Sequence, residues 1–261
     1  MHMLTFYKYQ GAGNDFLIVD NRKRLYNVAP HQIEALCNRR FGIGADGLML
    51  LEDHPEADFA MRYFNSDGNE ATMCGNGGRC IVAFANKLQI IGDSTTFMAV
   101  DGLHKATIGK ENIVSLQLQP VERITTIEEG YFLDTGSPHV VTFIQKPMTH
   151  EEVVQQGRIL RYDNRFAPQG TNVNFVLVTD DALRIWTYER GVEDETLACG
   201  TGVTAAAIAA HKYLKTDKVS FHMKAQGGHL HVSYKATPEG FQHIWLTGPA
   251  TFVFKGEMPM P

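Results

Sequence analysis

Cysteine is scarce in this sequence of 261 residues, and its spacing excludes two common uses. The four cysteines, Cys37, Cys74, Cys80 and Cys199, are too few for a disulfide scaffold in a chain of this length. Cys74 and Cys80 are separated by five residues, so the CxxC pairs of structural zinc sites are absent and no metal site is expected. Cys37 and Cys80 fall inside helical stretches and are interpreted as buried, chemically idle thiols. Free thiols of this kind indicate a reducing, cytoplasmic environment.

Long apolar runs and basic clusters are also lacking. No apolar segment approaches the ~20 residues of a membrane-spanning helix, and the opening MHMLTFYKYQ has no apolar core of a signal peptide. The net charge is −5 without any block of Lys or Arg, which argues against nucleic acid and anionic membranes as partners. The 44% of hydrophobic residues suffices for a proper core. We expect a soluble, unexported protein.

A dinucleotide site is disfavoured, although residues 42–47 read GIGADG and match the letters of a GxGxxG motif. A loop that binds a dinucleotide follows a strand and opens a helix. Here Arg39-Arg40-Phe41 precedes the motif, and the strand-like residues 48–51 follow it. No lysine lies in a recognisable phosphate loop for pyridoxal phosphate either. The sequence therefore predicts no cofactor.

What the sequence does contain is one cysteine motif in two copies. Cys74 is followed by Gly-Asn-Gly and then by the apolar residues 81–85. Cys199, 125 positions further on, is followed by Gly-Thr-Gly and the apolar residues 204–210. The second run is apolar nearly all round, as in a helix that is surrounded by a sheet. Each cysteine is therefore predicted to stand at the start of a buried helix.

Other landmarks recur at nearly the same step. Gly13 precedes the strand-like residues 16–19, and Gly136, 123 positions later, precedes residues 140–144. We interpret the chain as two copies of one α/β (α+β) unit, each a bent, mostly antiparallel sheet wrapped around a central helix. Pro120 and the polar residues after it mark the best boundary. We expect residues 1–118 in the first half, joined by a C-terminal strand at 250–261, and residues 119–249 in the second.

A cysteine at a helix N-terminus has a chemical use. Unpaired backbone N–H groups and the positive end of the helix dipole lower the pKa of a thiol, so that thiolate is available at neutral pH. The glycines let a ligand approach the backbone amides closely. We call this arrangement, a cysteine and the glycine-containing turn after it at the start of a helix, a cysteine corner. A cysteine corner suits a nucleophile, a redox thiol or a proton carrier.

Two corners in pseudo-symmetric halves narrow the choice. Two thiols that face one substrate carbon from opposite sides suit the inversion of a stereocentre, in which a thiolate removes a proton and a thiol returns one. Amides at both helix starts would stabilise the negative charge that develops on an adjacent carboxylate. The pattern favours a proton transfer that needs no cofactor.

Six blocks, in chain order, carry a family resemblance: YQGAGNDF, GIGADG, YFNSDGNEATMCGNGGRC, TGSPH, GTNVNF and YERGVEDETLACGTG. With these blocks the sequence resembles the diaminopimelate epimerase family from residue 7 to about 210. That family interconverts LL- and meso-diaminopimelate, without a cofactor, in the synthesis of lysine and of peptidoglycan precursors. The resemblance implies this activity, the corresponding two-domain fold, a small-molecule substrate and a homodimer.

The resemblance also implies a role for each matching residue. Cys74 and Cys199 would be the acid–base pair. Four residues would present amides to the reacting carboxylate: Gly75, Asn76, Gly200 and Thr201. Five residues would hold the polar ends of the substrate: Asn14, Asn65, Asn172, Glu189 and Arg190. Arg190 suits bidentate contact with the distant carboxylate, and His139 and Glu189 match positions that set the protonation of the cysteines.

The sequence departs from the family pattern in three places. Gly47 stands where some members carry a glutamine that touches substrate, and Ser137 stands where many carry an asparagine. The segment from Glu189 to Cys199 is one residue longer than in many members, with the extra length at residues 192–194. These departures bear on the geometry and the substrate preference, and they leave the cysteine pair intact.

Two alternatives stay open. A proline or hydroxyproline racemase-like enzyme would use the same fold and two-base logic, but that family usually has histidine where this chain has Asn76. A thiol redox or metal-binding protein could use Cys74 and Cys199 instead. Bound zinc or a stable disulfide in active material would distinguish this last alternative.

Overall fold

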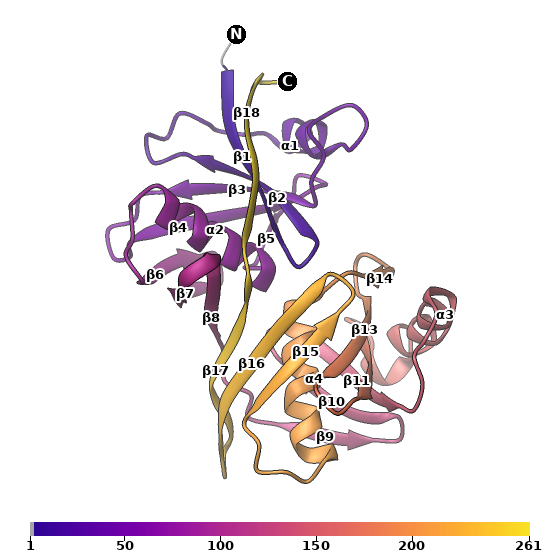
Figure 1. The fold of residues 1–261 in the computed structure, drawn as a ribbon. Helices are drawn as coiled ribbons and strands as arrows, with labels where there is room; N and C mark the ends of the chain where they lie inside the picture. Colours follow the sequence, from indigo (N-terminus) through magenta and orange to yellow (C-terminus); the bar gives the residue numbers. More distant parts are fainter. Residues whose placement is uncertain (1–2) are drawn as a thin grey trace. The chain divides into compact units, whose positions relative to one another are not determined.

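The computed structural model describes residues 3–261 and divides into two compact units. Unit 1 contains the residues up to Leu116 together with Gly248–Pro261, and unit 2 contains Gln117–Thr247. In each unit a sheet and helices are combined, and strands dominate (Figure 1). Within residues 3–261, no helix has both the length and the apolar character needed to cross a membrane.

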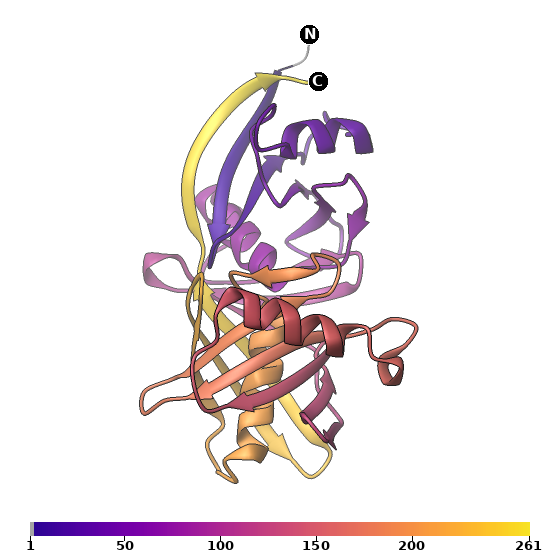
Figure 2. The same cartoon turned by 90° about the vertical axis from the view of Figure 1, so that its right-hand side faces the viewer.

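The sheet of unit 1 is mostly antiparallel. Its strands are β1 (Met3–Gly11), β2 (Asn14–Asp20), β3 (Gly47–Glu52), β4 (Phe59–Asn65), β5 (Glu70–Ala71), β6 (Ser94–Ala99), β7 (Gly102–Ile108), β8 (Ile113–Leu118) and β18 (Thr251–Pro259). The C-terminal strand β18 runs antiparallel beside β1 (Figures 1 and 2). From β1 the pairing continues through β2, β3, β4, β6 and β7 to β8, and β5 pairs with β4. The β2–β3 and β4–β6 pairs are parallel.

Unit 2 repeats this scheme. Its strands are β9 (Ile124–Ile127), β10 (Gly130–Asp134), β11 (Pro138–Ile144), β12 (Asn172–Val178), β13 (Leu183–Glu189), β14 (Asp194–Thr196), β15 (Ser220–Ala225), β16 (Gly228–Thr237) and β17 (Gly240–Pro249). Pairing runs from β9 through β10, β11, β12, β13, β15 and β16 to β17, and β14 pairs with β13. The β11–β12 and β13–β15 pairs are the parallel counterparts of β2–β3 and β4–β6. The predicted fold class, two homologous α/β units, is confirmed.

A helix lies at the centre of each unit. In α2 (Gly75–Lys87), all residues from 75 to 85 are buried, and the helix contacts β1, β2, β3, β7 and β18. In α4 (Gly200–Tyr213), residues 202–210 are buried, and the helix contacts β10 to β13, β15 and β16. Alanine, the strongest helix former, fills much of α4 and lets strands approach on every side. The expectation of a helix that is apolar nearly all round is met in α4.

Two smaller helices cover the sheets. In unit 1, α1 (Pro30–Cys37) packs Ile33 and Leu36 into a cluster with residues of β2 and β3. In unit 2, α3 (His150–Arg161) begins at a capping box of Thr149 and Glu152 and packs Val153 near Trp186 and other apolar residues of β12 and β13. Two short 3₁₀ turns, η1 (Lys110–Asn112) and η2 (Asn164–Phe166), complete the helical elements of residues 3–261.

The GIGADG segment serves the end of α1 and does not open a helix. Gly42 N–H donates to Asn38 O at 2.9 Å, Ile43 N–H to Leu36 O at 2.9 Å, and Ala45 N–H to Cys37 O at 3.0 Å. These amides therefore satisfy carbonyls at the C-terminus of a helix. Strand β3 begins at Gly47, the last residue of the motif. The segment therefore ends a helix and leads into a strand, and the strand that the sequence predicts after the motif is confirmed.

Candidate active site

The first cysteine of the repeated motif begins the central helix of unit 1. Cys74 is the N-cap residue of α2 with an extended backbone, and its carbonyl accepts a hydrogen bond from Gly78 N–H at 2.7 Å. Its sulfur lies 3.7 Å from Asn14 Oδ1, as a thiol donor to that oxygen. The same oxygen accepts from Asn76 Nδ2 at 3.3 Å. A partly exposed thiol at a helix start is thus joined to two asparagines that the sequence singles out.

A charged network fixes the side chain of Asn14. Its Nδ2 donates to Asp46 Oδ2 at 2.5 Å. Arg39 Nη2 bridges Asp46 and Asp15 with two contacts of 2.6 Å, and Lys8 Nζ lies 2.7 Å from Asp15 Oδ2. Burial alone would raise the pKa of Asp15, but the hydrogen bonds from Arg39 and Lys8 hold it at about 2. The carboxylate of Asp15 therefore stays ionised at neutral pH. The bond from Asn14 Nδ2 to Asp46 keeps the amide oxygen of Asn14 turned toward Cys74.

A buried arginine, which the sequence analysis missed, lies behind this corner. Arg79 has no exposed surface; its Nη1 donates to Gly75 O at 3.2 Å and its Nη2 to Asn76 Oδ1 at 3.0 Å. A third bond runs from Nε to Pro249 O at 3.4 Å. Burial lowers the pKa of Arg79. The bond to Asn76 Oδ1 directs Asn76 Nδ2 at Asn14. The sequence held one sign of this role: an arginine inside an otherwise apolar helix is expected to be buried and must then have hydrogen-bond partners.

The second cysteine begins the central helix of unit 2 in the same way. Cys199 is the N-cap residue of α4, is 8% exposed, and accepts at its carbonyl from Val203 N–H at 2.8 Å. Its sulfur lies 3.4 Å from Thr201 Oγ1. Thr201 is held in turn, because Thr135 Oγ1 donates to its carbonyl at 2.9 Å. Both corners thus present a cysteine followed by a glycine at the positive end of a buried helix.

His139 is fully buried behind the Cys199 corner. Its Nε2 lies 3.0 Å from Ser137 Oγ, and its Nδ1 lies 3.0 Å from Asn174 Nδ2. Burial, and then the charge of Arg190, lower the pKa of His139 to about 3. The imidazole is therefore neutral at physiological pH. The sequence analysis assigned no role to Ser137 or Asn174. It noted Ser137, in the motif TGSPH, only as a departure from the family pattern, and Asn174 only as part of the motif GTNVNF.

Asn172, Glu189 and Arg190 lie together at the end of the β12–β13 pair. Asn172 Oδ1 accepts from the backbone N–H of Arg190 at 2.9 Å, and its Nδ2 donates to Pro138 O at 3.0 Å. Glu189 Oε2 accepts from Thr196 Oγ1 at 2.8 Å. The side chains of Glu189 and Arg190 are partly exposed, so they remain accessible to a ligand. Unit 2 thus gathers every residue that the sequence assigned to this half: His139, Asn172, Glu189, Arg190, Cys199, Gly200 and Thr201.

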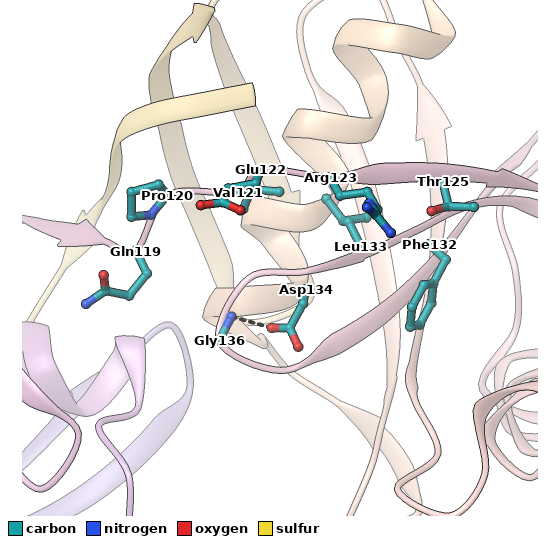
Figure 3. Close-up of a pocket in the computed structure, with 10 residues that line it drawn as sticks. All are labelled: Gln119, Pro120, Val121, Glu122, Arg123, Thr125, Phe132, Leu133, Asp134 and Gly136. Carbon is teal, nitrogen blue, oxygen red and sulfur yellow. Dashed lines mark hydrogen bonds between the residues drawn. The ribbon is translucent and has the colours of Figure 1, made fainter. Parts of the chain in front are cut away.

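A cavity of about 580 Å³ lies elsewhere in unit 2 (Figure 3). It is lined by Gln119, Pro120, Val121, Glu122, Arg123, Thr125, Phe132, Leu133, Asp134 and Gly136. One wall is the turn after β10, in which Gly136 N–H donates to Asp134 Oδ1 at 2.8 Å. None of these residues is among those assigned to substrate or catalysis. The turn nevertheless bears on the site, because Ser137 follows it directly.

A family model described as diaminopimelate epimerase matches residues 6–123 and 131–253 of this chain. The chain belongs to the diaminopimelate epimerase family. The diaminopimelate epimerase of Flavobacterium psychrophilum is 51% identical, over 97% of this chain and 99% of that protein. The one of Chlorobaculum tepidum is 42% identical, over 96% and 99%. The one of Aquifex aeolicus is 38% identical, over 98% of each.

Solved structures extend the likeness in fold beyond this family. A phenazine biosynthesis protein of the PhzF family from Bacillus anthracis superposes with a TM-score of 0.78 at 14% identity, over 99% of this chain and 100% of that one. A hydroxyproline epimerase from Agrobacterium vitis gives 0.70 at 16% identity, over 98% and 92%. At these identities the likeness concerns the fold alone.

The first departure from the family pattern, Gly47, has a steric reason. A Cβ atom at Gly47 would lie 2.5 Å from Phe64 O and 2.6 Å from Tyr63 Cε2. The ring edge of Tyr63 therefore occupies the space in which a glutamine side chain would begin. Gly47 pairs with Asn65 in the β3–β4 register, and Asn65 is the exposed last residue of β4.

The longer segment after Glu189 forms a fixed loop. Glu193 adopts a left-handed backbone with φ 60°. Its carboxylate accepts from Gly191 N–H at 3.0 Å and from Arg161 Nε at 3.0 Å. Tyr162 and Tyr188 donate their hydroxyls to the same carboxylate at 2.9 and 3.2 Å. The loop is therefore anchored on α3, and β13 keeps the strand pairing that β4 has in unit 1.

Proposed function

We propose that this chain interconverts LL- and meso-diaminopimelate by a two-base proton transfer between Cys74 and Cys199, without a cofactor. The reaction would supply a precursor of lysine and of peptidoglycan. The observation that carries the proposal is the repetition of one chemical corner. Each cysteine is the N-cap residue of a buried central helix, at the same place in two units of identical strand pairing, in a chain of this family.

In the proposed mechanism, one cysteine as thiolate removes the α-proton, and the other as thiol protonates the opposite face. The negative charge passes onto the α-carboxylate while the proton is absent. Backbone N–H groups of Gly75 and Asn76, and of Gly200 and Thr201, are among the four that a helix start leaves without a helical partner. Directed at the carboxylate, they would stabilise the charge where it develops.

The polar groups around each corner would select the substrate. Arg190 would bind the distant carboxylate with two parallel N–H bonds, which a planar guanidinium provides. Asn172 holds the backbone of Arg190 and would thereby orient it. Asn14, Asn65 and Glu189 would bind the amino groups and the carboxylate oxygens. An enzyme for proline or hydroxyproline would need no group for a second carboxylate, and Asn76 stands where that family usually has histidine.

The proposal also includes a cytoplasmic location and a homodimer of two identical chains. Within each chain, the two units, residues up to 116 with 248–261 and residues 117–247, are the two halves of the duplicated enzyme. Sedimentation equilibrium would measure the dimer, and a monomer at all concentrations would contradict it. The alternative of a metal-binding thiol protein gains no support from the structure. Within residues 3–261 no three His, Cys, Asp or Glu side chains are grouped so as to hold a metal ion.

Chiral chromatography of LL-diaminopimelate incubated with reduced protein tests the proposal. Meso-diaminopimelate should form, and Cys74→Ala and Cys199→Ala should each lower the rate by roughly 10²–10⁴-fold, the usual contribution of a positioned acid or base. Cys37→Ala is the matched control, because Cys37 is buried outside both corners, and should retain activity. Turnover of proline or hydroxyproline instead would move the chain to the alternative substrate class.

A further inference from the structure

Behind Cys199 the structure contains a chain of hydrogen bonds whose direction can be worked out. It starts at Asn174, whose Nδ2 lies 3.0 Å from the carbonyl oxygen of Val140 and 3.0 Å from His139 Nδ1. A carbonyl oxygen only accepts, so the nitrogen of the amide must face Val140. Thr187 Oγ1 donates to Asn174 Oδ1 at 3.0 Å, which agrees with this orientation. The second N–H of Asn174 therefore points at His139 Nδ1.

This contact fixes the tautomer of His139. Nδ1 accepts the hydrogen bond, so in the neutral ring the proton sits on Nε2. Full burial keeps the ring neutral, with its pKa near 3. Nε2–H then donates to Ser137 Oγ at 3.0 Å. Asn172 Nδ2 donates to the same hydroxyl oxygen at 3.4 Å.

Ser137 has thereby used both of its acceptor positions. A hydroxyl has two lone pairs and one hydrogen, so the hydrogen of Ser137 is left for Thr201 Oγ1, 3.2 Å away. Thr201 accepts this bond, and its own hydrogen is directed at Cys199 Sγ, 3.4 Å away. Every donor in the series points the same way, from His139 toward the sulfur.

We propose that Ser137 and Thr201 form a hydroxyl relay, polarised by neutral His139, whose last O–H stabilises the thiolate of Cys199. The proposal rests on the proposed function, in which Cys199 is one of the two bases. Ser137 acts through Thr201 and is a positioning residue. A hydrogen bond to a charged acceptor is stronger than one to a neutral acceptor, and a chain of such bonds strengthens each member. The relay therefore favours thiolate over thiol.

At the corresponding place in unit 1 the hydrogen bond runs in the opposite direction, from the cysteine to its neighbour. His139 pairs with Asn172 in β11–β12 as Phe16 pairs with Gly47 in β2–β3, so Ser137 is the counterpart of Asn14. Asn14 presents an oxygen to Cys74, and an oxygen accepts from the protonated thiol. The presence of serine at 137, where many family members carry asparagine, thus replaces an amide by a hydroxyl that passes a hydrogen bond on.

Other titratable groups stand on the elements around the two cysteines and enter the comparison. In unit 2 they are, besides neutral His139 on β11, Asp134 on β10 and Glu189 and Arg190 at the end of β13, two strands that contact α4, and Glu195 on β14, which pairs with β13. Near Cys74 the buried cation is Arg79. The test therefore compares variants that differ at one hydroxyl and keep all of these charges.

The test is a titration of thiolate by ultraviolet absorbance, with free protein in a Cys74→Ala background. Burial raises the pKa of Cys37 and of Cys80 to about 12, so below about pH 9 the thiolate signal comes from Cys199. Ser137→Ala should raise the midpoint by about one pH unit, which is roughly tenfold less thiolate below the midpoint. Thr201→Val, which removes the last donor, should raise it at least as much.

Two matched variants keep the test specific. Ser137→Thr retains a hydroxyl and should titrate like the parent protein. Thr204→Val removes a buried hydroxyl on the same helix, one that donates to Gly200 O at 3.0 Å, and should leave the midpoint unchanged. An unchanged midpoint in both Ser137→Ala and Thr201→Val, or an equal shift in Thr204→Val, overturns the relay.

Turnover separates the relay from the proposed function. With Cys74 present, Ser137→Ala should lower kcat with little change in KM, because Ser137 is not assigned to substrate. Cysteine-dependent turnover with unshifted titrations would refute the relay and keep the function. Shifted titrations in a protein that turns over no diaminopimelate would confirm the relay and refute the function.

Discussion

The burial of neutral His139 predicts an acid-sensitive stability of known sign. The pKa of this histidine falls from 6.5 to about 3 on folding, chiefly because burial penalises the imidazolium and further because Arg190 is near. Between these two values the unfolded chain binds a proton at this position and the folded chain does not. The free energy of unfolding therefore decreases as the pH decreases through this window, by about 1.4 kcal/mol per pH unit.

From pH 7 to pH 5 this single group should lower the free energy of unfolding by about 2 kcal/mol. His139→Gln removes the titration while keeping a polar side chain of similar reach. Urea unfolding at a series of pH values would measure the free energy for both proteins. The stability of the His139→Gln variant should fall about 2 kcal/mol less than that of the parent between pH 7 and pH 5. Acid titration of carboxylates occurs in both proteins and cancels in the difference.

His31→Gln provides the control, because it also removes one imidazole but at an exposed position on α1. It should not reproduce the effect. If the curves of parent and His139→Gln run parallel from pH 7 to pH 5, His139 is not held neutral by burial. The direction assigned to the hydrogen bonds behind Cys199 would then have no basis, because it depends on a neutral His139 ring.

Three further predictions follow from the two corners. Arg79→Lys keeps the charge but loses the fork of donors that fixes the first turn of α2, so kcat should fall by roughly 10-fold or more; unchanged steady-state kinetics would contradict this role. Gly47→Gln should lower the free energy of unfolding by about 1–3 kcal/mol, because the new Cβ meets a backbone carbonyl and the ring of Tyr63; denaturant unfolding at parent stability would show that the strands shift freely. Oxidant should abolish activity and dithiothreitol should restore it, through a disulfide between Cys74 and Cys199; irreversible or absent loss would argue that the two thiols do not face each other.

Much of the fold could be predicted because duplication leaves a signal in one sequence. The steps of 123 and 125 positions between glycine and cysteine landmarks required two similar units, and the identical strand pairing confirms them. The all-round apolar character of residues 204–210 required a helix enclosed by a sheet, which α4 is. Local context also separated the GIGADG segment from a dinucleotide loop, because β3 follows the motif where a helix would be needed.

The side-chain network behind each cysteine could not be predicted from the sequence. In the sequence, Asn174 is one residue of a predicted strand, and nothing marks it as part of a site. Its role depends on simultaneous hydrogen bonds with Val140, His139 and Thr187. These contacts join positions that are 13 to 35 residues apart, and strand register decides them. Arg79 was passed over because its partners are backbone carbonyls and an amide, which leave no pattern in the sequence. The catalytic and binding roles assigned to individual residues remain predictions.

The central claim is that the two cysteines act as separate bases on one α-carbon. Proton NMR of LL-diaminopimelate in D₂O with reduced protein, alongside Cys74→Ala and Cys199→Ala, tests it most directly. We predict that the α-proton signal disappears while the meso isomer accumulates, and that each variant forms the meso isomer roughly 10²–10⁴-fold more slowly. Accumulation of the meso isomer at the parent rate in either variant, or no exchange with the parent protein, would contradict the account.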